Sequence, residues 1–292
     1  MRELEERTAE MAADLVEKVL AAGRFDGIRD FGKPLVMRII PDALGLPPED
    51  RDNLLTYNYY LLKGRGAWRH LPWTDEELAE SEKVTAWIAR ACERENLAPD
   101  GLGAQIYAAA DAGEISSYEA GMLVRSFLSA GTDTTFGAIA NTLNFLMTYR
   151  DQWDKLRDDP GLARNAYEEG MRFRGPAQII ARNTLDEMDY CGARMGKHDK
   201  VIAFVGSANR DPDRWEDPDS FQIERNANGH LALGVGIHGC VGQMVARMEA
   251  EKLLGELARC VPDMRIGPDG VEYSANGRVI EKLDLEILGH YA

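Results

Sequence analysis

One cysteine lies in a glycine-rich stretch whose residue types favour ligand chemistry. The stretch Leu233–Gly242 reads Leu-Gly-Val-Gly-Ile-His-Gly-Cys-Val-Gly, so Gly234, Gly236 and Gly242 surround Cys240. Glycines permit a tight turn and let backbone N–H groups approach whatever the sulfur holds. The residues after Cys240 have helical periodicity, which puts the sulfur at a helix N-terminus, where the helix dipole stabilises a thiolate. A thiolate on such a loop is a natural metal ligand.

Three other interpretations of Cys240 remain open from the residues alone. It can be a buried structural cysteine, or it can share a zinc ion with His230 and His238, although a second Cys or His pair at finger-like spacing is missing. It can also be the nucleophile of a hydrolase, but no motif places a His–Asp pair near it. The glycine spacing favours the ligand interpretation.

A second chemical segment, Ala130–Thr135, lies inside a long apolar run. A capping signature opens this run, and its periodicity predicts one buried helix over about 116–149. Gly131 costs about 1 kcal/mol in a helix interior, and a buried Asp133 costs more unless it is hydrogen-bonded. Locally unfavourable residues that cluster in this way indicate a functional site. The alternative is a kink in which Thr134 bonds back to a carbonyl.

The remaining periodicity predicts a mainly α-helical chain with small β-sheets, and the length of 292 residues allows one large domain or two ordinary ones. Besides 116–149, helices are expected at 3–22, 31–45, 50–63, 74–96, 160–173 and after Cys240; strands are expected at 178–184 and 200–205, with a β-ribbon at 264–288 around Gly267–Gly270.

The bulk composition limits the partners of the protein. A net charge of −15 over 292 residues argues against nucleic acid and against an anionic membrane surface. The four cysteines lack disulfide-like spacing, which suits a reducing compartment. The charged N-terminus does not resemble a secretion signal, and no apolar run is long enough to span a bilayer. We therefore expect a cytoplasmic protein without a membrane partner.

The cysteine stretch resembles the haem-binding loop of the cytochrome P-450 family, Phe-Gly-x-Gly-x-His/Arg-x-Cys-x-Gly. The resemblance implies that Cys240 is the axial ligand of a haem b iron and that His238 is the polar residue two positions before it. Gly234 and Gly242 match the family's glycines. Leu233 replaces the usual aromatic residue, a change expected to alter redox tuning more than ligation.

The segment Ala130–Thr135 is similar to the family's Ala/Gly-Gly-x-Asp/Glu-Thr-Thr segment on its long central helix. By this resemblance, the small residues Ala130 and Gly131 let that helix pass over the haem face. Asp133 and Thr134 then handle protons for bound dioxygen.

Three arginines and a glutamate match further family positions. Alone, Glu169 and Arg172 read as a surface pair three residues apart. They lie between the other two motifs in the family's order and resemble its structural Glu–Arg pair, with Arg225 as the third member of a triad. Arg182 fits the position that reaches a haem propionate. The alternative for Arg182 is a strand-edge arginine in solvent.

The resemblance covers nearly the whole chain, but the family's N-terminal quarter is expected to be absent. That quarter supplies the first strands of the larger sheet, a helix that holds the haem propionates, and the roof of the substrate pocket. The resemblance therefore implies an N-terminally truncated P-450 fold, with residues 1–292 forming a single domain. The implied activity is a haem-dependent monooxygenase that uses O₂ and two electrons from an iron–sulfur ferredoxin and its reductase. The alternative is a haem-binding or structural remnant without activity.

The substrate expectation also comes from resemblance. Segments 206–212 and 238–247 are similar to bacterial members that hydroxylate or O-demethylate para-substituted benzoates. Arg125 and Ser126 precede Thr134 by about two helical turns, and they are candidates to hold the carboxylate of a small aromatic acid. Tyr57 is a candidate to add a hydroxyl. The alternative is that Arg125 caps the mouth of the helix in solvent.

Overall fold

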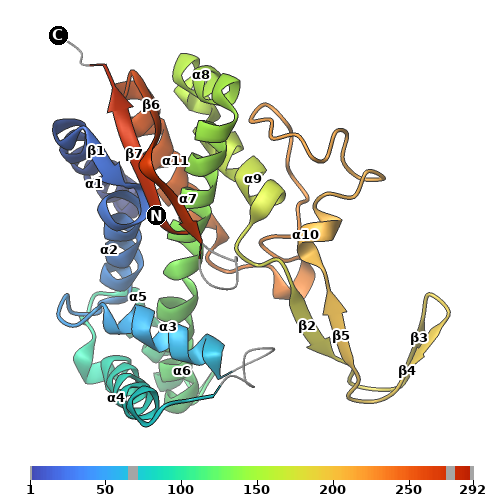
Figure 1. Ribbon diagram of the computed structural model, residues 1–292. Coiled ribbons are helices and arrows are strands. Elements are labelled where there is room, and N and C mark those ends of the chain that lie inside the picture. Colours follow the sequence, from blue (N-terminus) through green and yellow to red (C-terminus); the bar gives the residue numbers. More distant parts are fainter. Residues whose placement is uncertain (1, 65–71, 274–279, 290–292) are drawn as a thin grey trace.

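The computed structural model describes residues 2–64, 72–273 and 280–289 and is mainly helical, with three small antiparallel sheets (Figure 1). The elements are α1 (Arg2–Ala22), β1 (Arg24–Asp26), the π-helix η1 (Gly27–Gly32), α2 (Lys33–Leu44), α3 (Asn53–Lys63), α4 (Asp75–Ala91), the 3₁₀ turn η3 (Arg94–Asn96), α5 (Leu102–Asp111), α6 (Ser117–Ala130), α7 (Asp133–Thr148), α8 (Arg150–Asp158), the 3₁₀ turn η4 (Pro160–Leu162), α9 (Ala163–Arg174), β2 (Ile180–Asn183), β3 (Met188–Tyr190), β4 (Ala193–Met195), β5 (Lys200–Ala203), α10 (Val205–Ala208), the 3₁₀ turn η5 (Gly236–His238), α11 (Gln243–Cys260), β6 (Asp263–Tyr273) and β7 (Ile280–Leu288). The predicted fold class, mainly α with small sheets, is confirmed.

Two apolar cores hold the described helices together. The larger core joins α1, α7, α8, α9, α11 and the β6–β7 pair, and the smaller joins α3 to α6. Helix α2 contributes Leu35 and Ile39 to the larger core and Met37 and Leu44 to the smaller. Because one short helix supplies side chains to both, the two cores are mechanically linked.

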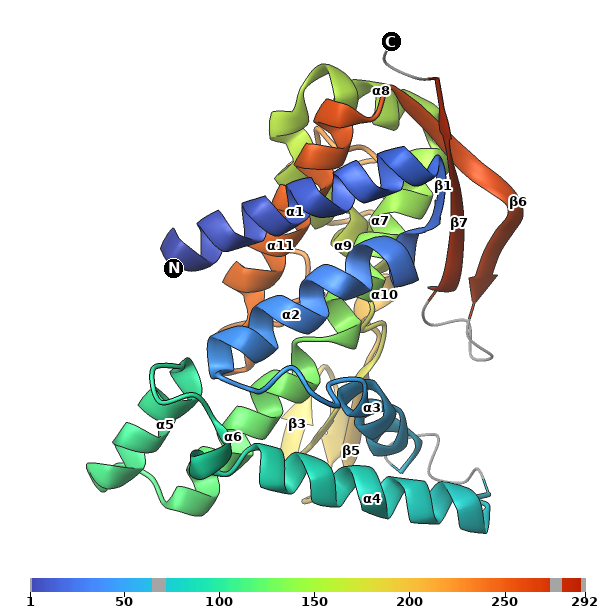
Figure 2. The same ribbon diagram turned by 90° about the vertical axis from the view of Figure 1, so that its left-hand side faces the viewer.

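Helix α9 packs against both α7 and α11 (Figure 2). Nearly every residue of α7 is buried, as expected for a helix that is apolar all round. Gly170 of α9 lies against α7 so closely that a Cβ there would be 2.1 Å from Thr142 Oγ1. The glycine therefore sets how near these two helices come.

The first sheet has the strand order β1-β7-β6. The predicted ribbon is present, but Gly267–Gly270 is a bulge within β6, since the pairing register shifts between Ile266 and Val271. A Cβ at Gly267 would be 2.2 Å from Asp284 Oδ2, which explains the glycine. The connection between β6 and β7 lies outside the described residues.

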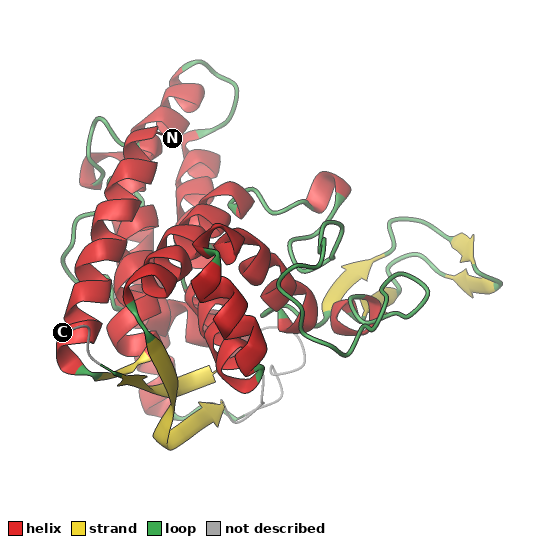
Figure 3. Cartoon of the chain, turned by 90° about the horizontal axis from the view of Figure 1, so that it is seen from above, coloured by secondary structure: helices red, strands yellow, loops and turns green. Residues whose placement is uncertain are grey.

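The other two sheets are the hairpins β2–β5 and β3–β4, which extend away from the helices as an arm (Figure 3). Arg182 of β2 is paired with Val201 of β5. Both predicted strand segments are confirmed, with β3 and β4 as an additional hairpin between them.

The predicted helix over 116–149 is divided into α6 and α7, and this part of the prediction is wrong. Its predicted capping box at Ser116 is confirmed. The break falls at Thr132, whose φ of −101° and ψ of −83° are not helical. Asn58 of α3 donates to Ser129 O at 2.7 Å and to Thr132 Oγ1 at 3.0 Å. A side chain therefore satisfies a carbonyl that the broken helix leaves without an intrahelical partner.

Among the described helices, none combines the length and apolarity that crossing a lipid bilayer requires.

Candidate active site

Backbone hydrogen bonds close the loop that carries Cys240. The amide of Cys240 donates to Leu233 O at 2.7 Å, and the amide of Gly234 donates to Leu231 O at 3.0 Å. Gly234 has a φ of +69°, and a Cβ there would be 2.4 Å from His238 O. The loop therefore requires glycine at this position for both conformation and space.

The sulfur lies just before the first turn of α11, a helix of 18 residues. Cys240 is half-buried, and Gly242 caps the helix by accepting hydrogen bonds from the amides of Val245 and Ala246. The first N–H groups of a helix have no intrahelical acceptor and carry partial positive charge. A negatively charged sulfur is stabilised at this end.

Four apolar side chains on and beside the loop are exposed: Val235 by 62%, Ile237 by 98%, Val241 by 75% and Met244 by 57%. We call these four residues the apolar rim. Exposed apolar residues that gather in one place mark a binding surface. A soft sulfur donor flanked along the chain by exposed apolar side chains suits a flat, largely apolar iron macrocycle, so these residues fit a haem. His238 is exposed on the same loop, and Leu233 is half-buried against the larger core.

At the α6–α7 break, Ala130 and Thr134 are exposed. Thr134 Oγ1 donates to Ala130 O at 2.7 Å, which is the bond that the kink alternative expected. The neighbouring Asp133 is half-buried, with Oδ1 3.4 Å from Asn58 Nδ2. The break therefore exposes the hydroxyl of Thr134 next to the carboxylate of Asp133, which the buried side-chain amide of Asn58 contacts.

Gly131 has a structural explanation that does not involve a cofactor. A Cβ at Gly131 would be 2.9 Å from Phe127 O and 3.4 Å from side-chain carbons of Ile40 on α2. The glycine lets the end of α6 approach α2, and its place over a haem face stays a prediction.

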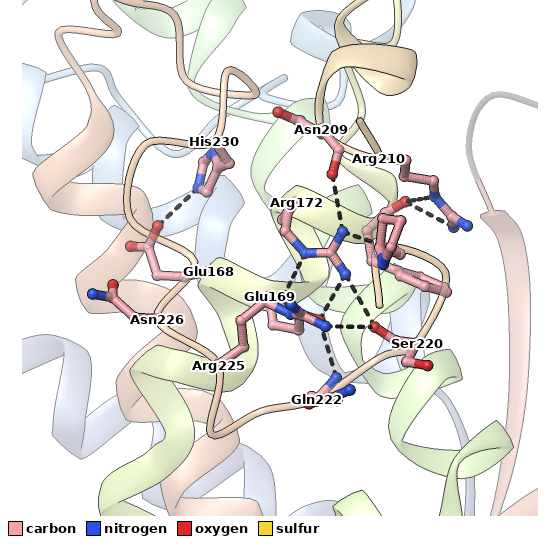
Figure 4. Close-up of polar contacts among 12 residues, drawn as sticks. Glu168, Glu169, Arg172, Asn209, Arg210, Ser220, Gln222, Arg225, Asn226 and His230 are labelled. Atoms are coloured by element: carbon pink, nitrogen blue, oxygen red, sulfur yellow. Dashed lines mark hydrogen bonds and ion pairs between the residues drawn. The ribbon is translucent and has the colours of Figure 1, made fainter. Parts of the chain in front are cut away.

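Glu169, Arg172 and Arg225 form one ion-pair network (Figure 4). Arg172 binds Glu169 through two parallel hydrogen bonds of 2.7 and 2.8 Å, and both side chains are fully buried. Arg225 Nε donates to Glu169 Oε1 at 3.2 Å. The reading of Glu169 and Arg172 as a surface pair is therefore wrong, because bidentate geometry in a buried setting makes the pair a rigid clamp.

The same arginine fixes the chain that leads to the cysteine loop. Arg172 Nη1 donates to Asn209 O and Pro218 O, both at 2.9 Å, and Nη2 donates to Ser220 O at 3.1 Å. The amide of Gln222 donates to Glu169 Oε1 at 3.0 Å. A long irregular segment is thereby held against α9.

Sequence reasoning missed a second buried carboxylate, Glu168. His230 Nε2 lies 2.8 Å from Glu168 Oε2, and the guanidinium of Arg247 on α11 binds both carboxylate oxygens. Burial opposes ionisation of Glu168, but the hydrogen bonds from His230 and Arg247 outweigh it and lower the pKa of the carboxyl to about 2. The adjacent Glu-Glu pair preceding Arg172 was the only signal in the sequence.

This pairing also bears on the zinc alternative. His230 is buried against Glu168, whereas His238 is exposed on the cysteine loop. Within the described ranges no group of three His, Cys, Asp or Glu side chains is placed to hold a metal ion. Among the described residues, Cys240 therefore has no partners for a zinc site.

The remaining predicted residues lie apart from this network. Arg182 is exposed, and its Nη1 donates to Ala181 O at 2.8 Å. Ser126 Oγ donates to Met122 O at 2.7 Å, and Tyr57 is buried in the smaller core.

Arg125 is half-buried on α6, and its guanidinium forms no hydrogen bond or ion pair with any residue in the part of the chain that the structure describes. The straight two-turn spacing from Arg125 to Thr134 is interrupted by the break at Thr132.

A mainly helical fold with a backbone-closed cysteine loop at a helix mouth, an apolar rim and a buried Glu–Arg–Arg network defines a haem-thiolate protein. A family model described as Cytochrome P450 matches residues 161–259, which include α9 and the cysteine loop. Cytochrome p450 CYP199A2 of Rhodopseudomonas palustris (strain ATCC BAA-98 / CGA009) is 42% identical over 289 residues, covering 98% of this chain and 70% of that relative. The chain belongs to the cytochrome P450 family, as the resemblance predicted, and its enzyme class is that of a bacterial P450 monooxygenase with a haem-thiolate iron.

Solved structures agree. The crystal structure of CalO2 matches with a TM-score of 0.87 and 28% identity, covering 98% of this chain and 73% of that one. Cytochrome P450 CREJ in complex with (4-ethylphenyl) dihydrogen phosphate matches with a TM-score of 0.87 and 27% identity, over the same 98% and 73%.

Proposed function

We propose that residues 1–292 form one domain that binds haem b through Cys240 and hydroxylates or O-demethylates a small aromatic carboxylic acid. The observation that carries this proposal is the half-buried thiol on a closed loop just before α11, flanked along the chain by the residues of the apolar rim. When bound, the haem supplies the activation of O₂ with two electrons, which we assign to an iron–sulfur ferredoxin and its reductase. The contribution of α2 to both cores supports the single domain.

Within this proposal, the chain's own part in the chemistry is proton handling at the α6–α7 break. The hydroxyl of Thr134 donates to Ala130 O and is exposed, so its oxygen can still accept a hydrogen bond and pass on a proton. Asp133 is the adjacent carboxylate and takes a proton from solvent for Thr134 to deliver. Asn58 holds the carboxylate of Asp133 from α3.

The proposed substrate contact is Arg125. A half-buried guanidinium with no carboxylate partner among the described residues, in a chain with a net charge of −15, favours an anion. Ser126 is adjacent to Arg125 on α6, and Tyr57 of α3 is buried in the smaller core, to which α6 also contributes. An anionic para-substituted phenyl compound is also the ligand in the complex of the similar P450 CREJ.

The cofactor assignment is tested with an absorption spectrum. Haem-loaded, reduced protein exposed to carbon monoxide should show the red-shifted Soret band of a thiolate-bound haem. Cys240→Ala should abolish the band, whereas Cys191→Ala, at an exposed cysteine on the arm, should leave it unchanged. A band that survives Cys240→Ala refutes the ligand assignment. Haem-loaded protein that shows the band but never turns over would favour the inactive haem-binding alternative.

The substrate and proton assignments need separate measurements. Titration with 4-methoxybenzoate should shift the spin state, the neutral methyl ester should do so far more weakly, and Arg125→Gln should remove the difference. No response to the acid would contradict the substrate. Thr134→Ala should retain haem but divert reducing equivalents to hydrogen peroxide, and Thr134→Ser should restore coupling. Equal coupling in all three proteins would contradict the role of the hydroxyl.

A further inference from the structure

Glu168 connects the two ends of the cysteine loop. On the side before the loop, His230 Nε2 lies 2.8 Å from Glu168 Oε2; on the side after it, the guanidinium of Arg247 binds the same carboxylate, with Nη2 3.3 Å from Oε2. Arg247 Nη1 also donates to Gln243 Oε1 in the first turn of α11 at 2.6 Å. The side chains of Glu168 and His230 are only 9% and 2% exposed. One buried carboxylate therefore spans the segment that contains Cys240.

The direction of the hydrogen bonds follows from the main chain. The amide of Ala232 donates to His230 Nδ1 at 3.2 Å, so Nδ1 is the accepting nitrogen. Nε2 then carries the hydrogen and donates it to Glu168 (Figure 4). His230 therefore accepts a hydrogen bond from the amide of Ala232, just before the loop, and donates one to a carboxylate of α9. Its orientation is fixed at both ring nitrogens.

Two adjacent carboxylates on α9 have separate tasks. Glu169 binds Arg172 and Arg225, which hold the segment around residues 209–225, whereas the partners of Glu168 among the described residues, His230 and Arg247, flank the cysteine loop. Asn209 joins the two networks, because its carbonyl accepts from Arg172 at 2.9 Å and its Oδ1 accepts from the amide of Leu231 at 2.7 Å. The fold and the loop are therefore anchored by neighbouring but distinct groups.

We propose that Glu168, acting through His230 and Arg247, is a positioning residue that fixes the distance between the loop ends and so holds the sulfur of Cys240 where it can ligate the haem iron. This inference rests on the proposed function. The loop is rich in glycine and has few side-chain anchors of its own, so the position of the sulfur depends on where its two ends are held. Releasing either end lets the Leu233–Cys240 backbone bond open and the sulfur leave its position before the first turn of α11.

The test uses Glu168→Gln and Glu169→Gln side by side. Glu168→Gln should raise the fraction of carbon-monoxide complex that shows the blue-shifted band of a haem without its thiolate bond, and should speed haem transfer to excess apomyoglobin about tenfold. Glu169→Gln should lower the denaturation midpoint while the folded fraction keeps the thiolate band. Glu224→Gln, which removes an exposed pair with Lys155, should change neither property.

Two further variants keep the test decisive if Glu168→Gln folds poorly. His230→Gln retains an N–H that can reach Glu168 and should keep the thiolate band, whereas His230→Ala should lose it in part. Unchanged bands and haem transfer in both Glu168→Gln and His230→Ala overturn the inference alone. Wild-type protein without a thiolate band overturns the proposed function and this inference together.

Discussion

The approach of α9 to α7 at Gly170 makes a quantitative prediction. An added Cβ would lie 2.1 Å from Thr142 Oγ1 and 3.1 Å from Thr142 Cβ. Ordinary contacts between such atoms are longer by more than an ångström in the first case. Thr142 is fully buried and its hydroxyl donates to Ala138 O at 2.9 Å, so it cannot turn away without breaking that bond.

Two contributions to the stability of Gly170→Ala oppose each other. The cost of the steric overlap is larger than the gain in helix propensity. Gly→Ala in a helix interior stabilises by about 1 kcal/mol. Overpacking a buried site costs roughly 1–3 kcal/mol, and a broken hydrogen bond adds about 1 kcal/mol. Gly170→Ala should therefore destabilise by about 2 kcal/mol. Gly255→Ala on α11 is the matched control, because its Cβ would meet nothing closer than 3.5 Å; it should be neutral or stabilising by up to about 1 kcal/mol.

Urea unfolding of Gly170→Ala, Thr142→Ala and the double variant measures the interaction free energy between positions 170 and 142. Removing the Thr142 hydroxyl takes away the closest atom, so the double variant should be more stable than the sum of the single changes by about 1 kcal/mol or more. Strict additivity, or a Gly170→Ala protein as stable as the wild type, would refute the close helix approach.

Three other outcomes follow from the same structure. Gly234→Ala should weaken haem retention, measured by haem transfer, far more than it lowers the urea midpoint, because the strain is confined to the loop. Arg172→Met should cost about 3–5 kcal/mol of stability and Arg225→Met clearly less, since the side chain of Arg225 is 11% exposed and that of Arg172 is fully buried; equal losses in chemical denaturation would contradict this order. The free energy of unfolding should rise and then fall with increasing pH, because the pKa of the Glu168 carboxyl is lowered and burial raises the pKa of Glu249.

Local signals explain what the sequence alone could predict. The capping box at Ser116 is present because it needs only residues three positions apart. The turn at Gly234 is equally local, since its glycine requirement comes from His238 four residues later. The Glu169–Arg172 pair was visible as a spacing, but its burial was not.

Contacts between distant residues explain what the sequence could not predict. Asn58 lies 74 residues before Thr132, and nothing in α3 indicates that its amide holds a helix break. Glu168 and His230 are 62 residues apart. Strand β1 is only three residues long and exists because it pairs with β7 near the other end of the chain. In each case the element or its role is created by tertiary packing, which periodicity does not record.

The pH prediction depends on two buried glutamates with opposite shifts. Glu168 has a folded-state pKa of about 2, below the value of about 4.3 expected in an unfolded chain, so the unfolded state binds more protons as pH falls. Its contribution of about 3 kcal/mol is present above pH 4.3 and is lost on acidification towards pH 2. Burial raises the pKa of Glu249 well above its ordinary value, so the folded state retains a proton that the unfolded state releases.

Stability therefore falls by up to about 1.4 kcal/mol per pH unit above pH 4.3, until the raised pKa of Glu249 is passed. Unfolding free energies of Glu249→Gln and Glu168→Gln, each taken relative to the wild type at several pH values, cancel the effect of the other carboxylates. Glu249→Gln should gain stability relative to the wild type as pH rises from 5 to 7. Glu168→Gln should lose its deficit as pH falls from 4 to 2. A Glu249→Gln difference that does not depend on pH would mean that the buried carboxyl is ionised in the folded protein, and the assignment of its proton would be wrong.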